Sequence, residues 1–267
     1  ECDIINRLAH QHGVTMQIAL RYNPDVTANT IAKIATGHSG AKFGLSAEAI
    51  RALLDRQSGY PHLTFAGIHV HIGSQLGDTD ATVAAVRSAR ELVAPYPKIR
   101  TLDIGGGIPT SYQPGQELPD PTAFASALAP YVEGYEVILE PGRSIVADAG
   151  LLVATVLYIK QHGGQKFVVL DTGMTELIRP ALYDAHHEIV PVVRNTTAST
   201  PVEIVGPVCE TTDSLARARM LPVIEPGYQV ALLTAGAYGF VMASNYNARP
   251  RPPEVVVNSD GRTWQVA

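Results

Sequence analysis

The sequence has few of the features that place a protein outside the cell or in a membrane. It contains only two cysteines, Cys2 and Cys209, far apart in the chain, so a disulfide framework is not expected. No apolar run approaches the roughly 20 residues of a membrane-spanning helix. The first stretch, "ECDIINRLAHQHG", lacks both the basic and the apolar part of a signal peptide. We therefore expect a cytoplasmic protein.

Clusters of positive charge are also lacking. The formal net charge is -5, and the scattered Lys and Arg residues give no electrostatic footprint for nucleic acid or an anionic membrane surface. With 46% hydrophobic and 17% charged residues, the 267-residue chain can bury a substantial core. These properties favour a globular protein whose partner is a small molecule.

The first half of the sequence alternates between short apolar stretches and helical patterns. Strands are predicted at residues 16–23, 65–73, 99–107 and 135–142, and helices at 46–57, 79–96 and 120–133. Strands joined by crossover helices form a parallel sheet, either doubly wound or closed into a barrel. The chain also opens as if in the middle of a helix, so we expect further sequence upstream.

Each later strand of this half ends in side chains that packing does not require. His69 and His71 precede Gly73-Ser74, Asp103 precedes a triple glycine, and Glu140 precedes Gly142-Arg143. The carboxyl ends of parallel strands meet at one edge, where ligands bind. The three strand ends therefore predict one ligand pocket.

The strand ends each have a simpler interpretation as well. His69 and His71 share one face of a strand and could bind a metal, but no third acidic or thiol ligand stands near them in the sequence, so we predict no metal. The glycines at 105–107 could form a plain turn. They lack the pattern of a P-loop or a dinucleotide site, yet they allow close backbone approach to a phosphate.

Glu140 poses the sharpest alternative. "LEPGR" could be a strand-end turn with a solvated ion pair between Glu140 and Arg143. A carboxylate at a low-dielectric strand end is otherwise costly unless it meets a cation or a protonated heterocycle. A pyridinium nitrogen at Glu140 and a phosphate at the glycines would together match pyridoxal phosphate.

The second half reads as an all-β domain. Strands are predicted at residues 151–161, 165–171, 186–193, 200–207, 229–235 and 252–257, with turns at His162-Gly163-Gly164 and Asp260-Gly261. We therefore divide the chain into residues 1–147, an α/β domain, and 148–267, a β domain.

Two clusters in the second half could carry chemistry. Cys209 could be a small buried hydrophobe, but its polar neighbours Glu210 and Thr211 favour partial exposure. A thiol next to a carboxylate in a ligand site could donate a proton. Asp184, His186 and His187 could suggest a metal, but adjacent histidines on a strand point to opposite sides.

Taken together, the motifs resemble one family. "GIHVHIGSQ", "LDIGGGIP", "LEPGRSIVADAG", "DTGMTELIRPALYDAHHEI", "GPVCETTD" and "GAYGFVMASNYNARPRPPEVVV" resemble, in order and spacing, the signatures of diaminopimelate decarboxylases, pyridoxal-phosphate enzymes of the alanine-racemase-like fold. The resemblance covers essentially the whole chain. It implies the C-terminal part of a pyridoxal-phosphate-binding (β/α)8 barrel, similar to a TIM barrel, followed by a β-sandwich or β-barrel domain.

The resemblance also implies which residues hold the cofactor. His71 would stack on the pyridine ring, and Glu140 would pair with the ring nitrogen. The remaining cofactor contacts would come from Ser74, Gly105, Gly106, Gly107, Gly142, Arg143 and Tyr238.

By the same resemblance, the reaction would convert meso-2,6-diaminoheptanedioate to L-lysine and CO2, the last step of lysine biosynthesis. Cys209 would deliver the proton that replaces CO2, to the site of a neighbouring subunit, so a homodimer is expected. His71 and Glu140 would complete the catalytic set. The substrate would be bound by Arg143, Arg179, Tyr183, Glu210 and Tyr238.

One family feature is absent. The Schiff-base lysine stands in an early "YAxKAN"-like stretch, and the chain has no such stretch. Its lysines, Lys33, Lys42, Lys98, Lys160 and Lys166, stand in other contexts. We therefore expect this chain to be a fragment, and we make no prediction about the activity of the fragment by itself. The alternatives are a decarboxylase of ornithine, arginine or carboxynorspermidine, or a non-catalytic relative that lost its lysine.

Overall fold

The computed structural model describes residues 1–30, 36–37 and 40–266. These residues form two compact units. The first contains Glu1–Thr110 and Glu117–Arg143, and the second contains Ser111–Gln116 and Ser144–Ala267. The assignment of Ser111–Gln116 to the second unit has no signal in the sequence. Among the described residues, no helix is both long enough and apolar enough to cross a membrane.

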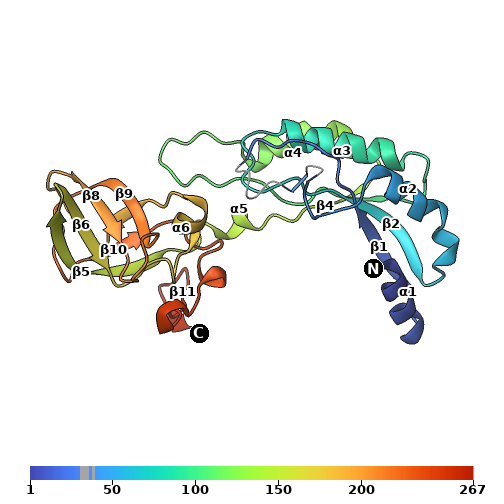
Figure 1. The fold of residues 1–267 in the computed structure, drawn as a ribbon. Helices are drawn as coiled ribbons and strands as arrows, with labels where there is room; N and C mark the ends of the chain where they lie inside the picture. The colour runs from blue at the N-terminus through green and yellow to red at the C-terminus, as the bar shows by residue number, and fades with distance from the viewer. Residues whose placement is uncertain (31–35, 38–39, 267) are drawn as a thin grey trace. The chain divides into compact units, whose positions relative to one another are not determined.

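The first unit is built on a four-stranded parallel sheet (Figure 1). Its strands lie in the order β1 (Met16–Arg21), β2 (Leu63–His69), β3 (Thr101–Asp103) and β4 (Glu136–Ile138). The predicted parallel sheet is confirmed. β2, β3 and β4 are shorter than predicted, because the polar residues and glycines that follow His69, Asp103 and Ile138 lie outside the strands.

Four helices accompany this sheet: α1 (Cys2–Gln11), α2 (Ala47–Asp55), α3 (Asp80–Val93) and α4 (Pro121–Val132). A short 3-10 turn, η2 (Gln57–Gly59), follows α2. The Ser46 hydroxyl accepts a hydrogen bond from the Ala49 N–H, and Asp120 Oδ1 accepts one from the Ala123 N–H. Each cap accepts a hydrogen bond from an N–H group that has no acceptor within the first helical turn. α2 and α4 therefore begin where the sequence predicts.

The core of this unit lies between the sheet and its helices. Ile68 of β2 and Leu102 of β3 are completely buried, and so are Ala85, Val86 and Ala89 of α3. α3 packs against β2 and beside α4 (Figure 1). Complete burial of a side chain as large as Ile or Leu contributes about 1.5–3 kcal/mol relative to leaving it in water. This core fixes the C-terminal ends of β2 and β3 relative to each other.

β4 differs from the sequence-based expectation. Val137, Ile138 and Leu139 read as a buried strand, but their exposed fractions are 39%, 44% and 53%. β4 is the last strand of the sheet, with only β3 as a neighbour, so one edge has no partner among the described residues. The apolar run therefore reflects β propensity rather than burial in this chain.

The second unit is an all-β unit, as predicted. Its six-stranded sheet has the order β7-β10-β5-β6-β8-β9, in which β6 and β8 are parallel and the other neighbours are antiparallel (Figure 1). The strands are β5 (Leu152–His162), β6 (Gln165–Leu170), β7 (Ile189–Pro191), β8 (Thr200–Val205), β9 (Ser214–Leu221) and β10 (Gln229–Leu232). A separate hairpin joins β11 (Val255–Val257) and β12 (Thr263–Gln265).

The glycine turns fall where they were predicted. Gly163 and Gly164 have φ values of 55° and 79° between β5 and β6, and Gly261 has a φ of 82° between β11 and β12. These values lie in the left-handed region, which glycine adopts without a steric penalty.

Short helical segments complete the second unit. They are α5 (Arg143–Val146), whose first residue belongs to the first unit, α6 (Arg179–Tyr183), η3 (Phe240–Met242) and η4 (Tyr246–Ala248). None of these segments was predicted, because each is too short for a helical period to show in the sequence.

Candidate functional site

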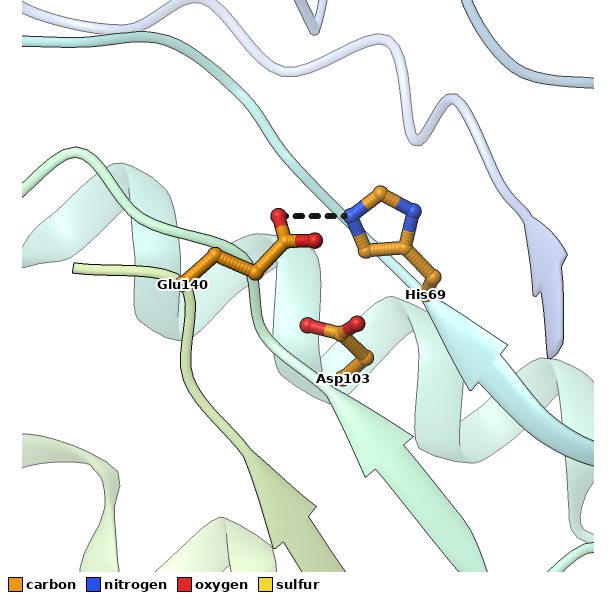
Figure 2. A group of neighbouring side chains, drawn as sticks. All are labelled: His69, Asp103 and Glu140. Carbon is orange, nitrogen blue, oxygen red and sulfur yellow. Dashed lines mark ion pairs between the residues drawn. The ribbon is translucent and has the colours of Figure 1, made fainter. Parts of the chain in front are cut away.

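Three strand ends of the first unit bring charged side chains together. His69 ends β2, Asp103 ends β3, and Glu140 follows β4 by two residues. Figure 2 shows the three side chains pointing toward one another. One ring nitrogen of His69 and one carboxylate oxygen each from Asp103 and Glu140 lie within 4.8 Å of one another. The structure therefore gathers, at one edge of the sheet, residues that lie up to 71 positions apart.

Glu140 occupies a more exposed place than its sequence context indicates. Its Oε2 lies 3.5 Å from His69 Nε2, and half of its side chain is exposed. The premise of a low-dielectric strand end is therefore wrong for this chain. His69 Nε2 is itself buried and has no hydrogen-bond partner in the described part of the chain. A half-exposed carboxylate beside such an atom can turn toward a cationic ligand.

The cluster also corrects the argument against a metal. No acidic residue stands near His69 in the sequence, but the fold brings both Asp103 and Glu140 to it. Residue types alone would allow a metal here. However, Asp103 Oδ1 already accepts a hydrogen bond from the Gly105 N–H at 2.9 Å, so this carboxylate holds the loop after β3.

His71 belongs to the glycine loop rather than to the carboxylate cluster. Its Nδ1 lies 3.1 Å from the Gly106 nitrogen, whose N–H donates to it, so a neutral ring carries its proton on Nε2. Burial is the main cause of a lowered His71 pKa, and the nearby charge of Arg21 adds to it. His71 is therefore held as a neutral ring, with one nitrogen fixed by the backbone.

The triple glycine fills a space in which no side chain fits. A Cβ at Gly105 would lie 2.7 Å from His71 Nδ1, and a Cβ at Gly107 would lie 2.7 Å from the Gly73 carbonyl. At Gly106 a Cβ would collide with the Glu140 carbonyl oxygen. The three glycines thus pack against both other strand ends. A plain surface turn would not need glycine at three successive positions.

Two side-chain contacts order the loop after β2. The Arg143 guanidinium is buried, and its Nη2 donates to Ser74 Oγ at 3.0 Å. Gln75 pairs with the Thr110 backbone, with Nε2 donating to the carbonyl at 2.6 Å and Oε1 accepting from the N–H at 3.1 Å. This places a hydroxyl and a guanidinium side by side. It also excludes the interpretation of Glu140 and Arg143 as a solvated pair.

These residues fit pyridoxal phosphate on their own chemistry. The Ser74 hydroxyl and the Arg143 guanidinium are donors of the kind that bind phosphate, and the glycine backbone admits close approach. Glu140 is a carboxylate with one exposed side, suited to a protonated ring nitrogen. His71 offers a neutral flat ring. No bulky side chain occupies the backbone positions at 105–107.

The second unit holds all the residues expected to bind substrate except Arg143, which belongs to the first unit. Arg179 and Tyr183 are the first and last residues of α6, so four positions separate them and they lie on the same side of the helix. Arg179 is buried, with 6% exposed. Its Nη1 lies 2.8 Å from His187 Nε2, and its guanidinium carbon lies 4.3 Å from the centre of the Tyr112 ring.

Cys209 and Glu210 lie in the turn between β8 and β9, and both are exposed. The exposure expected for the thiol is confirmed. Asp213, which is 4% exposed, organises this turn: its Oδ2 accepts from the Val208 N–H at 2.7 Å and its Oδ1 from the Met174 N–H at 2.6 Å. Burial is the main cause of its raised pKa, which these two N–H donors oppose.

The remaining predicted residues are placed as follows. Tyr238 is 40% exposed and has a positive φ of 59°. Gly142 has no atom close to the place of a Cβ. Asp184, His186 and His187 form no common cluster, because Arg219 and Glu188 contact His186, whereas His187 contacts Arg179. His186 and His187 precede β7, so the argument that adjacent strand histidines point to opposite sides does not apply to them.

The described lysines lie in varied surroundings. Lys42 lies 5.2 Å from the Phe43 ring centre, and Lys160 lies 5.6 Å from that of Phe167. Lys166 is in β6, and Lys98 precedes β3. Lys33 falls outside the described residues. Part of the "TGHSGAKFGLS" stretch does too.

The burial of His187 gives a stability prediction. Burial is the main cause that lowers its pKa from 6.5 to about 4, and the charge of Arg179 adds to it. Between these two pKa values the unfolded chain binds more protons, so stability falls as the pH decreases through this window. From pH 7 to pH 5 we expect a loss of about 2 kcal/mol from this residue.

His187→Gln in the full-length protein should remove that part of the pH dependence. Urea unfolding gives the free energy of unfolding of both proteins at pH 7 and pH 5. The loss between the two pH values is then compared between the unchanged protein and His187→Gln. Equal losses in the two proteins would contradict a buried neutral His187.

Several residues that contact predicted site residues were given no role in the site from the sequence. Tyr112, His187 and Asp213 are each buried, and each contacts a residue or loop that the sequence had singled out. Gln75 stands within a recognised motif but was given no role. A buried polar side chain cannot be identified from sequence periodicity, because its partners come from distant segments.

Comparisons with known proteins agree with the fold and the cofactor. Residues 13–236 match the family described as pyridoxal-dependent decarboxylase, C-terminal sheet domain. Diaminopimelate decarboxylase of Aquifex aeolicus is 40% identical over 265 residues, which cover 97% of this chain and 63% of that protein. The chain therefore spans less than two thirds of the length of this relative.

Solved structures give the same result. Diaminopimelate decarboxylase from Helicobacter pylori, complexed with L-lysine, superposes with a TM-score of 0.91 and 34% identity over 99% of this chain and 67% of that one. Lysine/ornithine decarboxylase from Vibrio vulnificus, complexed with cadaverine, gives a TM-score of 0.76 and 25% identity over 94% and 64%. The chain has the C-terminal part of the barrel followed by the β domain. It belongs to the pyridoxal-dependent decarboxylase family, as a homologue of the diaminopimelate decarboxylases.

Proposed function

We propose that the full-length protein removes one carboxylate from meso-2,6-diaminoheptanedioate, giving L-lysine and CO2, as the last step of lysine biosynthesis. The observation that carries this proposal is the strand-end arrangement of Glu140, His71 and the Ser74–Arg143 pair around the triple glycine. The choice of substrate rests on greater similarity to diaminopimelate decarboxylases than to the Vibrio vulnificus lysine/ornithine decarboxylase.

In this proposal all the cofactor-binding residues except Tyr238 belong to the first unit. Ser74, Arg143 and the backbone at 105–107 bind the phosphate, and Gly142 and Tyr238 make the further contacts that the resemblance implies. His71 lies against the ring face, and Glu140 keeps a proton on the ring nitrogen. When bound, pyridoxal phosphate supplies an electron-withdrawing ring that stabilises the charge left by loss of CO2.

Further residues are assigned to the substrate and to the proton. Arg143, Arg179 and Tyr183 bind carboxylates, Glu210 faces an ammonium group, and Tyr238 contributes to the same binding. A substrate that loses one carboxylate and keeps another needs a separate anchor for the one it keeps, which is the task of Arg179. The exposed Cys209 thiol donates the proton that replaces CO2.

The wider setting is also part of the proposal. The active protein is a cytoplasmic homodimer in which Cys209 serves the partner's site, and its domains divide at residue 147. This chain is a segment of it, and the Schiff-base lysine lies in the segment that the chain lacks. An upstream reading frame without a lysine in a "KAN" context would instead favour a non-catalytic relative.

A substrate comparison tests the proposed function. The full-length protein with pyridoxal phosphate is assayed for CO2 release from meso-diaminopimelate, ornithine, arginine and carboxynorspermidine. We expect the highest kcat/KM with meso-diaminopimelate, and L-lysine formed in equal amount to CO2. A preference for ornithine would refute the substrate assignment, and inactivity on all four would favour the non-catalytic relative.

A further inference from the structure

His187 is a buried polar residue to which neither the proposed chemistry nor the cofactor gives a task. It lies in the "DAHHEI" segment between α6 and β7, and its side chain is completely buried. It has two polar contacts: Nδ1 lies 2.8 Å from the Leu233 carbonyl oxygen, and Nε2 lies 2.8 Å from Arg179 Nη1. Both partners belong to the second unit.

The chemistry of the partners fixes the state of the ring. A carbonyl oxygen only accepts, so Nδ1 must carry the proton that it donates to Leu233. In the neutral ring Nε2 is then an acceptor, and it accepts from the guanidinium of Arg179, which only donates. His187 therefore offers Arg179 one lone pair in a fixed direction. Protonation would replace that lone pair with a second N–H, facing a cation.

Tyr112 supports the same guanidinium from another side. The Arg179 guanidinium carbon lies 4.3 Å from the Tyr112 ring centre. The Tyr112 and His187 rings form a T-shaped pair, with centroids 5.4 Å apart and an interplanar angle of 77°. A cation over an aromatic face gains about 0.5–2 kcal/mol, depending on how far it is desolvated. A hydrogen bond and a ring face thus restrict the orientation of one guanidinium.

We propose that His187 is a positioning residue that directs the Arg179 guanidinium toward the carboxylate that the substrate keeps. This inference rests on the proposed function, because it takes Arg179 as the anchor for that carboxylate. The consequence is selectivity: ligands with this carboxylate gain affinity from the fixed guanidinium, and ligands without it gain nothing.

Two substitutions separate the two contacts of His187. In His187→Gln the amide oxygen can reach the position of Nε2, so an acceptor for Arg179 is kept. In His187→Asn the shorter amide nitrogen matches Nδ1, so the donor to the Leu233 carbonyl is kept and the acceptor for Arg179 is lost. Each variant removes one contact of the same buried side chain, so they control for each other.

Paired inhibitors then test the direction of the effect. L-lysine and cadaverine differ by one carboxylate, and their inhibition constants are measured on the full-length holoenzyme. We expect His187→Asn to raise the inhibition constant of L-lysine about 10-fold or more, because the charged hydrogen bond that orients Arg179 is lost. The inhibition constant of cadaverine should change by less than about 2-fold. His187→Gln should keep both constants within about 3-fold of the unchanged protein.

Substrate kinetics give a second reading. The KM for meso-diaminopimelate should rise about 10-fold in His187→Asn with little change in kcat, since the carboxylate contact is the same in the ground state and the transition state. If His187→Asn does not fold, Tyr112→Ala replaces it, with an expected carboxylate-selective loss of about 3-fold.

The outcomes separate this inference from the proposed function. Equal weakening of L-lysine and cadaverine, or equal effects of Asn and Gln, would overturn the positioning role while decarboxylation of meso-diaminopimelate by the unchanged protein stands. Absence of that activity in the unchanged protein would refute the proposed function, whatever the inhibition constants of the variants.

Discussion

Glu140→Gln in the full-length protein is expected to lower kcat on the order of 100-fold, with a change in KM of about 2-fold or less. Glutamine preserves the shape of the side chain and removes only its charge. The ring nitrogen would then lose the group that keeps it protonated, and the charge developed during loss of CO2 would be less stabilised. Steady-state kinetics with meso-diaminopimelate measure both parameters.

The matched control is the carboxylate at the start of β4, the strand that Glu140 follows. Glu136 begins β4, is exposed, and accepts a hydrogen bond from Thr101 Oγ1 at 3.3 Å, at the opposite end of the strand from Glu140. Glu136→Gln should leave kcat and KM within about 2-fold, as surface changes away from a site do. Cofactor content is measured in both variants, so that loss of cofactor is not mistaken for loss of catalysis. An unchanged kcat in Glu140→Gln would contradict the pyridinium role, and "LEPGR" would then be only a strand-end turn.

Cys209→Ala should lower kcat on the order of 100-fold by a different route, because a positioned proton donor contributes about 10²- to 10⁴-fold. Cofactor binding and loss of CO2 survive in this variant, but delivery of the replacing proton slows. CO2 release and L-lysine formation, measured in parallel, should therefore no longer be equal. The exposed thiol has no packing to lose, so the free energy of unfolding should change little.

Cys2→Ala is the control for this experiment. Cys2 begins α1 in the first unit and is the other cysteine of the chain. Its substitution should leave the ratio of CO2 to L-lysine and the kcat unchanged. An unchanged kcat and an unchanged ratio of CO2 to L-lysine in Cys209→Ala would show that the thiol is not the proton donor.

The parallel sheet and the convergence of its strand ends could be predicted from sequence, because both depend on local patterns. Ser46 and Asp120 indicate the starts of their helices, because their side chains can cap the first turn. Gly163-Gly164 indicates a hairpin, because glycine adopts the positive φ values that the turn requires. Polar residues after apolar runs indicate strand ends without any knowledge of neighbours. These signals lie within a few residues of the feature they predict.

The failures have two physical causes, a weak local pattern and dependence on tertiary neighbours. β9, "SLARARML", was missed because Arg217 and Arg219 alternate with small and apolar residues, and no long apolar run marks the strand. The burial of β4 was misjudged because exposure depends on which strands lie beside it. The contacts of Tyr112, His187 and Asp213 were not predicted because their partners are set by tertiary packing.

The most direct test of the account is the protonation state of the cofactor's ring nitrogen in the protein. Pyridoxal phosphate labelled with ¹⁵N at that nitrogen is bound to the full-length protein and to Glu140→Gln, and the ¹⁵N chemical shift is measured by solid-state NMR. We expect the shift of a protonated pyridinium in the unchanged protein and that of a neutral pyridine in Glu140→Gln. A neutral pyridine in both proteins, or a pyridinium in both, would contradict the role assigned to Glu140.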